Sequence, residues 1–328
     1  MRLGFVGLAA RRVIMWSALT LQLVAAACEE DLEAAGDITS RLTAGSDAEV
    51  VGRVVVRQAG VVCGLALAPV ICRTFSERLN CTLEFRPEST AAGEFADGAQ
   101  VEAGTSVAVV RGPRSGVLTV ERTLLNFLTR MSGVATLTRR FVSAARTVNP
   151  NVKILDTRKT LPGWRQLDKY AVRAGGGENH RFGLYDAILI KDNHLADVPI
   201  DRLQETLTRW LERVPRAAIT ECKKGGAAGK AALTPDFVEV EVDNLEQFAE
   251  VCKVGRVDVV LLDNFSREQM RAAVKLRDEL GSKGRLELEA SGGVRLEDVG
   301  EIAATGVDRI SVGALTHSAV ALDIALEI

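Results

Sequence analysis

After residue 150, short apolar runs alternate with segments of helical texture. The apolar runs lie at 153–155, 187–190, 237–242, 257–262, 286–289 and 309–312. Strands that alternate with helices in this way predict a parallel α/β sheet. Each run ends in polar or glycine residues, and sites of α/β barrels form at the carboxyl ends of the strands. The pattern favours a barrel of at least six strands with a site at that edge.

The first half of the chain has a different texture. Apolar runs bounded by Gly and Pro predict short strands at 50–58, 82–85 and 106–110. Residues 120–148 carry apolar positions at helical spacing, which predicts one long helix. Gly133 is the point where this helix is expected to break or kink.

The N-terminal segment admits two interpretations. Arg11 and Arg12 precede 16 uncharged residues that end at Cys28, as in a secretory or lipoprotein signal. That stretch is shorter than the roughly 20 residues of a membrane span. The alternative is an amphipathic helix, whose apolar face would consist of Trp16, Leu19, Leu23 and Ala26. We favour the helix, which leaves residues 1–14 as an extension and Met15 as a second candidate start.

Charge is distributed unevenly along the chain. The net charge of −2 argues against general nucleic-acid binding. Residues 111–191, however, carry 15 Lys/Arg and only 5 Asp/Glu. A basic centre of this kind fits a pocket for a small polyanion, and a solvated basic face remains the alternative.

The six cysteines form no CxxC pair, and their spacing suits neither a zinc site nor a disulfide framework. We therefore expect reduced thiols in a reducing compartment, which indicates a cytoplasmic protein without a membrane anchor. The sequence also lacks GxGxxG and the P-loop pattern, which argues against dinucleotide-binding and P-loop folds.

Cationic side chains gather near the predicted strand ends. They are Arg122 at the start of the long helix, then Arg158, Lys159, Arg181 and Lys191. Guanidinium groups bind carboxylates in bidentate fashion, and Lys supplies a point charge. Such a set suits a ligand with several carboxylates or phosphates.

Acidic residues occupy two neighbouring strands. Alternation in the run 237–243 places Glu239, Glu241 and Asp243 on one face. Asp263 ends the next strand, so Glu241 and Asp263 are candidate Mg²⁺ ligands together with substrate oxygens. The alternative is that these carboxylates pair with Lys159 or Lys191.

Glycine-containing turns follow the last two predicted strands. Ser291 and Gly292 follow one of them, and Gly313 and His317 follow the other. Backbone N–H groups at such turns bind phosphate. All three histidines lie in polar, glycine-containing turns or beside them, which makes them candidate site residues. They are His180, His194 and His317.

Nine motifs occur in an order and spacing that resemble one family. They are DITS at 37–40, ERTLLN at 121–126, DTRKTLPG at 156–163, GGGENHR at 175–181, LIKDNH at 189–194, EVEV at 239–242, LLDN at 261–264, EASGG at 289–293 and SVGALTH at 311–317. Together they resemble the quinolinate phosphoribosyltransferases, also called carboxylating nicotinate-nucleotide pyrophosphorylases. The resemblance covers roughly residues 20–328. The stretch 213–234 is long for that family, and 221–234, with Lys223 and Lys224, is a candidate mobile loop.

The resemblance implies an enzyme, a pentosyltransferase of de novo NAD biosynthesis. Quinolinate and phosphoribosyl pyrophosphate would give nicotinate mononucleotide, pyrophosphate and CO₂, with Mg²⁺ as cofactor. It also implies a type II phosphoribosyltransferase-like α/β fold. Residues 1–130 would form an N-terminal α/β sandwich, joined by a C-terminal helix at about 316–328, and residues 131–315 an open, mostly parallel α/β barrel. Homodimers would share their active sites, and further assembly of the dimers is left open.

Roles follow from the resemblance, position by position. Arg122 would reach the neighbouring subunit's site. The quinolinate carboxylates would be bound by Arg158, His180, Arg181 and Lys191. Lys159 and Lys191 would face the pyrophosphate, and Glu241 and Asp263 would contact the ribose and Mg²⁺. The 5′-phosphate would be held by Ser291, Gly292, Gly313 and His317.

Two other functions remain open at this point. The first is a paralogous pyrophosphorylase-like enzyme with a different substrate. The second is a non-catalytic sensor of a phosphorylated ligand. The complete cationic set favours quinolinate, and the acidic pair Glu241 and Asp263 favours catalysis over sensing.

Overall fold

The N-terminal half is built around a four-stranded antiparallel sheet. The computed structural model describes residues 16–43, 48–91, 93–214 and 235–328. The strand order is β14 (Ile324–Glu327), β1 (Glu49–Val56), β7 (Thr105–Pro113) and β3 (Glu84–Pro87). The predicted strands at 50–58, 82–85 and 106–110 correspond to β1, β3 and β7. Two short ladders complete this half: β2 (Gly60–Val61) with β6 (Gln100–Val101), and β4 (Ser89–Thr90) with β5 (Gly93–Glu94).

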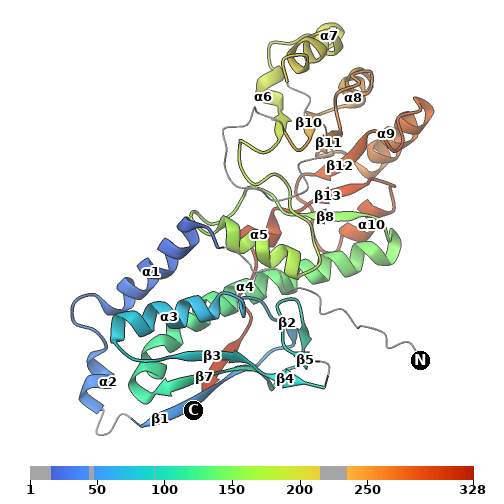
Figure 1. Cartoon of the computed structure of the whole chain (residues 1–328). Coiled ribbons are helices and arrows are strands. Elements are labelled where there is room, and N and C mark those ends of the chain that lie inside the picture. Colours follow the sequence, from blue (N-terminus) through green and yellow to red (C-terminus); the bar gives the residue numbers. More distant parts are fainter. Residues whose placement is uncertain (1–15, 44–47, 92, 215–234) are drawn as a thin grey trace, which may run out of the picture.

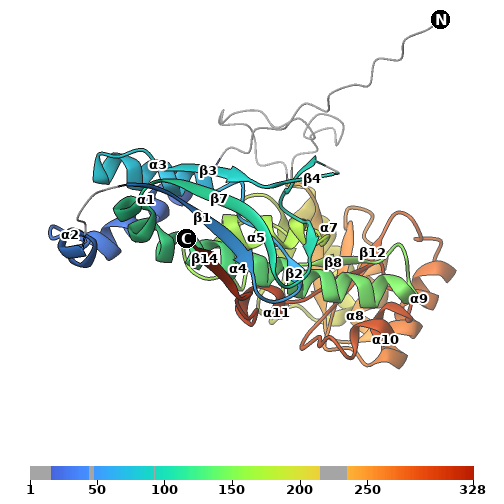
Figure 2. The same ribbon diagram turned by 90° about the horizontal axis from the view of Figure 1, so that it is seen from below.

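Helices pack on the apolar face of this sheet (Figure 2). They are α3 (Ala68–Leu79) and the first part of α4 (Arg114–Val148), while α1 (Ala18–Leu32) and α2 (Ile38–Thr43) pack against these helices. Side chains along β1 alternate between buried and exposed, as expected for a half-buried strand. Val54 and Val56 are buried, while Arg53 is exposed.

The helix α4 runs through both halves of the molecule (Figure 1). It contacts β1, β7 and β14 on one side and α5, β8 and α10 on the other. The expected boundary between residues 130 and 131 therefore falls inside one continuous helix. The expected break at Gly133 is wrong, since α4 continues to Val148. Glycine is needed there for close packing, because a Cβ atom would lie 2.1 Å from the Val320 carbonyl oxygen.

The second half forms the predicted open barrel. Its six parallel strands follow the order β8 (Lys153–Leu155), β13 (Arg309–Ser311), β12 (Glu287–Ser291), β11 (Val259–Asp263), β10 (Val238–Val242) and β9 (Ile188–Ile190). Each of them matches an apolar run of the sequence. Because all the ladders are parallel, the carboxyl ends of the strands meet at one edge.

Helices connect the barrel strands and cover their outer face (Figure 1). They are α5 (Arg165–Ala174), α6 (Asp192–Leu195), α7 (Ile200–Leu211), α8 (Leu245–Cys252), α9 (Arg267–Glu279), α10 (Val299–Ala303) and α11 (Ala314–His317). The apolar strand residues between these helices and the sheet form the barrel core, with Val240, Val260 and Leu288 fully buried.

The N-terminal segment is helical, but the predicted apolar face of this helix is wrong. Leu19 is 57% exposed, whereas Thr20, Val24 and Cys28 are buried. The Thr20 hydroxyl donates a hydrogen bond of 2.5 Å to Gln166, which fixes a polar residue on the inner face. Cys28 is 1% exposed within α1, so this side chain belongs to the core.

The end of the chain also differs from expectation. A C-terminal helix at about 316–328 is predicted, but α11 ends at His317 and the chain finishes in strand β14. The strand pairs antiparallel with β1, with Val54 opposite Leu326. Val54 on β1 and Ile324 on β14 are both buried, and this apolar packing favours an added strand.

Two further expectations lie outside the described residues. They are the extension 1–14 with the candidate start Met15, and the loop 221–234 with Lys223 and Lys224. In the parts of the chain that the structure describes, no helix combines the length and apolar character needed to cross a bilayer.

Candidate active site

A cavity of about 810 Å³ opens at the carboxyl ends of the barrel strands. Its walls come from the ends of β8 to β13 and from the loops that follow them. The predicted site residues that line it are Arg158, Lys159, His180, Arg181, Lys191, Glu241, Asp263, Ser291, Gly292, Gly313 and His317. The fold thus brings together residues that are up to 159 positions apart in the sequence, as between Arg158 and His317.

Arg122 is the predicted site residue that the structure leaves outside this cavity. It lies on the first half of α4 and its side chain is exposed. His194 is also absent from the walls. Its Nδ1 accepts a hydrogen bond of 2.9 Å from the Lys191 backbone N–H, which caps the short helix α6.

One wall of the cavity is strongly positive. Arg158 and Lys159 follow β8, and Arg181 follows the turn after α5. Burial and the nearby charge of Arg158 lower the pKa of Arg181 below its usual value. The buried Nε of Arg158 has no hydrogen-bond partner among the described residues. Two adjacent guanidinium groups in this state provide a binding site for an anion.

Opposite charges meet on the wall formed by β9 and β10. The Lys191 ammonium group contacts the Glu241 carboxylate in an ion pair. This is the alternative pairing that the sequence left open. Glu241 is 6% exposed, and Asp263 at the end of β11 receives a hydrogen bond of 2.8 Å from Asn264. A Lys–Glu pair beside a second carboxylate can bind a polar ligand through charges of both signs.

The turns after β12 and β13 bring backbone close to the cavity. Gly292 has φ of +100°, and a Cβ atom on it would lie 2.1 Å from Asn264 Oδ1. Gly313 lies against the ring of His317, where a Cβ atom would be 3.1 Å from Nε2. Glycine is therefore required sterically at 292, whereas at 313 it leaves space for the His317 ring, and both turns present backbone groups to a ligand.

A buried ionic network holds the loop that carries His180 and Arg181. The Asp156 carboxylate accepts hydrogen bonds from the His180 backbone N–H at 2.9 Å and from the Asn179 amide. Lys169 on α5 forms an ion pair with Asp156 and donates to the His180 carbonyl oxygen at 2.9 Å. The sequence placed Asp156 in a motif, but gave no signal that Lys169 is its partner 13 positions later.

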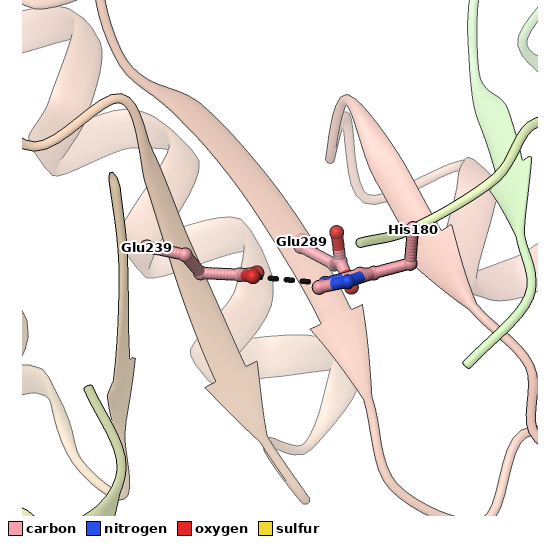
Figure 3. A group of neighbouring side chains, drawn as sticks. All are labelled: His180, Glu239 and Glu289. Carbon is pink, nitrogen blue, oxygen red and sulfur yellow. Dashed lines mark ion pairs between the residues drawn. The ribbon is translucent and has the colours of Figure 1, made fainter. Parts of the chain in front are cut away.

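A second buried cluster lies inside the barrel and reaches the cavity, which His180 and Glu289 help to line. His180 Nε2 is 2.8 Å from Glu239 on β10 and 3.5 Å from Glu289 on β12. Figure 3 shows both carboxylates directed at the ring. Arg309 Nε on β13 lies 2.7 Å from Glu289. Burial raises the pKa of Glu239 and of Glu289, the charge of Glu239 adds to the increase at Glu289, and both pKa values reach about 7.

Sequence reasoning missed most of this cluster. Glu239 was placed on the same face of its strand as Glu241, but Glu289 and Arg309 received no role. The signal was available, because a charged residue in a buried strand must have a partner. Among the described residues, His180, Glu239 and Glu289 also form the one group of three side chains spaced closely enough to bind a metal ion.

Comparison with known proteins gives a consistent family match. The model of the quinolinate phosphoribosyl transferase N-terminal domain matches residues 37–132, and that of the C-terminal domain matches residues 134–327. The chain is 40% identical over 304 residues to the carboxylating nicotinate-nucleotide pyrophosphorylase of Mycobacterium leprae, covering 92% of this chain and 94% of the relative. It is 35% identical to a decarboxylating quinolinate phosphoribosyltransferase of Nicotiana tabacum, covering 92% and 80%.

Solved structures agree with this match. The nicotinate-nucleotide pyrophosphorylase of Francisella tularensis superimposes with a TM-score of 0.76 at 33% identity. The alignment covers 96% of this chain and 98% of that structure.

Proposed function

The chain belongs to the quinolinate phosphoribosyltransferase family, and we propose that the cavity at the barrel mouth is where it carries out that reaction. The enzyme transfers phosphoribosyl from phosphoribosyl pyrophosphate to quinolinate with decarboxylation. The products are nicotinate mononucleotide, pyrophosphate and CO₂, and the step belongs to de novo NAD biosynthesis. The pair Arg158 and Arg181 is the observation that supports the assignment to this cavity. The two cations are adjacent, and a buried nitrogen of Arg158 has no hydrogen-bond partner among the described residues.

Quinolinate would bind on the positive wall. Its two adjacent carboxylates match two guanidinium groups and the nearby ammonium groups of Lys159 and Lys191, all of which line the cavity. His180 belongs to the same wall and has 8% of its surface exposed there. Nicotinate, with one carboxylate fewer, would leave part of this positive charge unpaired. The site therefore favours the dicarboxylate.

Phosphoribosyl pyrophosphate would occupy the opposite side. The turns that contain Ser291, Gly292, Gly313 and His317 present backbone and imidazole groups for the 5′-phosphate. Lys159 and Lys191 would bind the pyrophosphate. This arrangement directs the anomeric carbon of the sugar towards the quinolinate subsite.

The acidic pair Glu241 and Asp263 suits Mg²⁺. Both side chains line the cavity and offer carboxylate oxygens, the ligands that Mg²⁺ prefers together with substrate oxygens. Bound there, the ion would neutralise charge on the pyrophosphate leaving group. Glu241 also forms an ion pair with Lys191, so binding of the ribose hydroxyls or the metal ion would replace or share this contact.

The chemistry requires positioning and charge more than a protein nucleophile. The C–O bond to pyrophosphate breaks as the quinolinate ring nitrogen forms a bond to the anomeric carbon. Positive charge develops on the sugar, and the carboxylates of Glu241 and Asp263 stabilise it, while Lys159 and Lys191 stabilise the departing pyrophosphate. The adjacent carboxylate then leaves as CO₂. Its electron pair remains next to the positive ring nitrogen and takes up a proton from solvent.

A homodimer with shared sites accounts for Arg122. This cation lies outside its own chain's cavity and is exposed on α4. Apolar side chains are also exposed on the same half, with Leu19 57%, Ile38 69% and Leu42 87% accessible. Covering these residues with a second copy would place Arg122 at the partner's cavity and stabilise the dimer.

We propose that the protein is located in the cytoplasm, and the state of its cysteine thiols supports this. Cys28, Cys63, Cys72 and Cys252 are reduced and buried, as expected in a reducing compartment. Cell fractionation with intact-mass measurement tests this, and recovery of lipid-modified protein in membranes would contradict it.

The direct test is turnover by the purified protein. We expect nicotinate mononucleotide to form from quinolinate, phosphoribosyl pyrophosphate and Mg²⁺, with no product from nicotinate under the same conditions. Omission of Mg²⁺, with chelator present, should abolish the reaction. Folded dimer that turns over neither acceptor would overturn the proposed site. Binding of phosphoribosyl pyrophosphate without turnover would indicate a sensor.

A further inference from the structure

Three side chains of the cluster inside the barrel, Glu239, Glu289 and Arg309, have no role in the reaction as proposed above, whereas His180 also lines the cavity. The four side chains of the cluster come from separate elements: His180 from the loop after α5, Glu239 from β10, Glu289 from β12 and Arg309 from β13. Glu239 and Glu289 have no exposed surface. A group of this kind costs free energy to bury, so its persistence needs a reason.

The hydrogen bonds of the His180 ring define its tautomer. The Arg181 backbone N–H donates a hydrogen bond of 2.7 Å to His180 Nδ1. Nδ1 must therefore carry a lone pair, which places the ring proton on Nε2. Nε2 is the atom that lies 2.8 Å from Glu239 and 3.5 Å from Glu289, so its proton faces negative charge (Figure 3).

This arrangement links the barrel interior to the cavity wall. The ring of His180 holds the Arg181 backbone, and the carboxylates hold the ring. The main chain of His180 is fixed independently, because Asp156 accepts from its N–H and Lys169 donates to its carbonyl oxygen. The two glutamates orient the His180 ring. Through the ring, they set the direction in which Arg181 enters the cavity.

A cation in the cluster is the competing explanation. A metal ion bound to His180 would need the lone pair of Nε2, but the contact from Arg181 to Nδ1 leaves the proton on Nε2. Arg309 already places a positive charge 2.7 Å from Glu289. The observations therefore favour a positioning cluster over a metal site.

We propose that Glu239 and Glu289 are positioning residues for the acceptor substrate, which keep the His180 ring oriented so that the Arg181 backbone and side chain are set for binding quinolinate. The proposal rests on the proposed function, because it takes quinolinate as the ligand of Arg181. The phosphoribosyl pyrophosphate groups are assigned above to other residues, so we expect the effect to be specific for quinolinate.

Binding measurements on matched variants test the proposal. Glu239→Met removes the carboxylate that lies beside Nε2 at similar volume, whereas Glu239→Gln keeps an amide oxygen in its place. We expect Glu239→Met to weaken quinolinate binding by about tenfold or more, as for loss of a charge-assisted contact. Glu239→Gln should stay within about threefold of wild type on the same reasoning.

The second substrate and a control variant separate positioning from general damage. Affinity for phosphoribosyl pyrophosphate should be unchanged in both variants, and the KM for quinolinate should rise more than kcat falls. Glu77→Gln, an exposed carboxylate on α3 in the other half of the molecule, should leave both affinities unchanged. Equal loss of both ligands in Glu239→Met, or no loss of either, would overturn the proposal.

A measurement on the unliganded wild-type protein is independent of any variant's folding. Long-range ¹H–¹⁵N spectra of the imidazoles need to resolve only three histidines. We expect His180 to be the neutral tautomer with its proton on Nε2. A proton on Nδ1, or displacement of the His180 ring signals on adding Zn²⁺, would overturn the positioning role. Wild-type protein that shows the expected tautomer but binds no quinolinate would instead refute the proposed function.

Discussion

Tyr170 donates a hydrogen bond of 2.7 Å from its hydroxyl group to the Asp97 carboxylate, and this contact joins the two halves of the molecule. Asp97 lies before β6 in the N-terminal half, where it also accepts from the backbone N–H groups of Gly64 and Leu65 at 2.8 Å. Tyr170 lies on α5 of the barrel, and Trp16 packs edge-on against its ring at 5.2 Å between centroids. Burial and the charge of Asp97 raise the pKa of Tyr170, so the hydroxyl stays protonated as a donor.

Substitution of Tyr170 and substitution of Asp97 should both lower the free energy of unfolding, but by different amounts. Tyr170→Phe loses one hydrogen bond, and we expect a decrease of about 1 kcal/mol in the free energy of unfolding. Asp97→Ala also leaves backbone donors unsatisfied, so we expect roughly 2–4 kcal/mol. Urea unfolding measures both, with Tyr185→Phe as the control because Tyr185 is 72% exposed. Equal effects of Tyr170→Phe and Tyr185→Phe would show that the contact does not hold the halves together.

The positive wall predicts a substrate-specific defect. Arg158→Ala removes a guanidinium group that fits a carboxylate, and we expect quinolinate affinity to fall by about a hundredfold, as for loss of a charge-assisted pair. Binding of phosphoribosyl pyrophosphate should change by less than about threefold, because Lys159 and Lys191 remain. Calorimetric titration of each ligand alone measures this, with the exposed Arg202→Ala as control. Parallel loss of both affinities would contradict the assigned role.

The barrel could be predicted because its sequence signals are local. Each strand is an apolar run that ends in polar residues, and parallel pairing brings those ends to one edge. The sequence therefore predicts that Arg158 and Gly313 lie in one site, and both line the cavity. The α1 face could not be predicted this way, because Thr20 is buried only through its distant partner Gln166. The final strand β14 likewise depends on pairing with β1, about 270 positions earlier.

The interior cluster could not be predicted for the same reason, because it depends on contacts between residues that are distant in the sequence. A single sequence shows that Glu239 and Glu241 share a face of their strand, but not that Glu239 and Glu289, 50 positions apart, meet the same imidazole. Arg122 shows a different limit, because the place in a site that we propose for it depends on a second chain.

The interior carboxylates predict that stability falls as pH rises. Glu239 and Glu289 have pKa values of about 7 in the folded protein against an ordinary 4.5. The folded state therefore binds protons more tightly, so this contribution is fully present below about pH 4.5 and is lost as pH rises through about 7. Between pH 5 and 8, we expect the free energy of unfolding to decrease less in Glu289→Gln than in the wild type, by on the order of 1–3 kcal/mol. Urea unfolding across that range, with the exposed Glu77→Gln as control, decides the matter. A wild-type profile as flat as that of Glu289→Gln would contradict the raised pKa values.

The exposed position of Arg122 predicts complementation between inactive chains. Arg122→Ala and Lys191→Ala should each abolish activity, since one lesion affects the partner's cavity and the other its own. In a heterodimer of the two, one cavity receives both lesions and the other receives neither. Purified heterodimers should therefore regain about half of the wild-type activity, and a random mixture about a quarter. Differently tagged chains, co-expressed and separated by tandem affinity steps, allow both measurements, with Lys191→Ala paired with Glu241→Ala as the matched control that cannot complement. Heterodimers of verified composition that remain inactive would show that Arg122 serves its own chain or none.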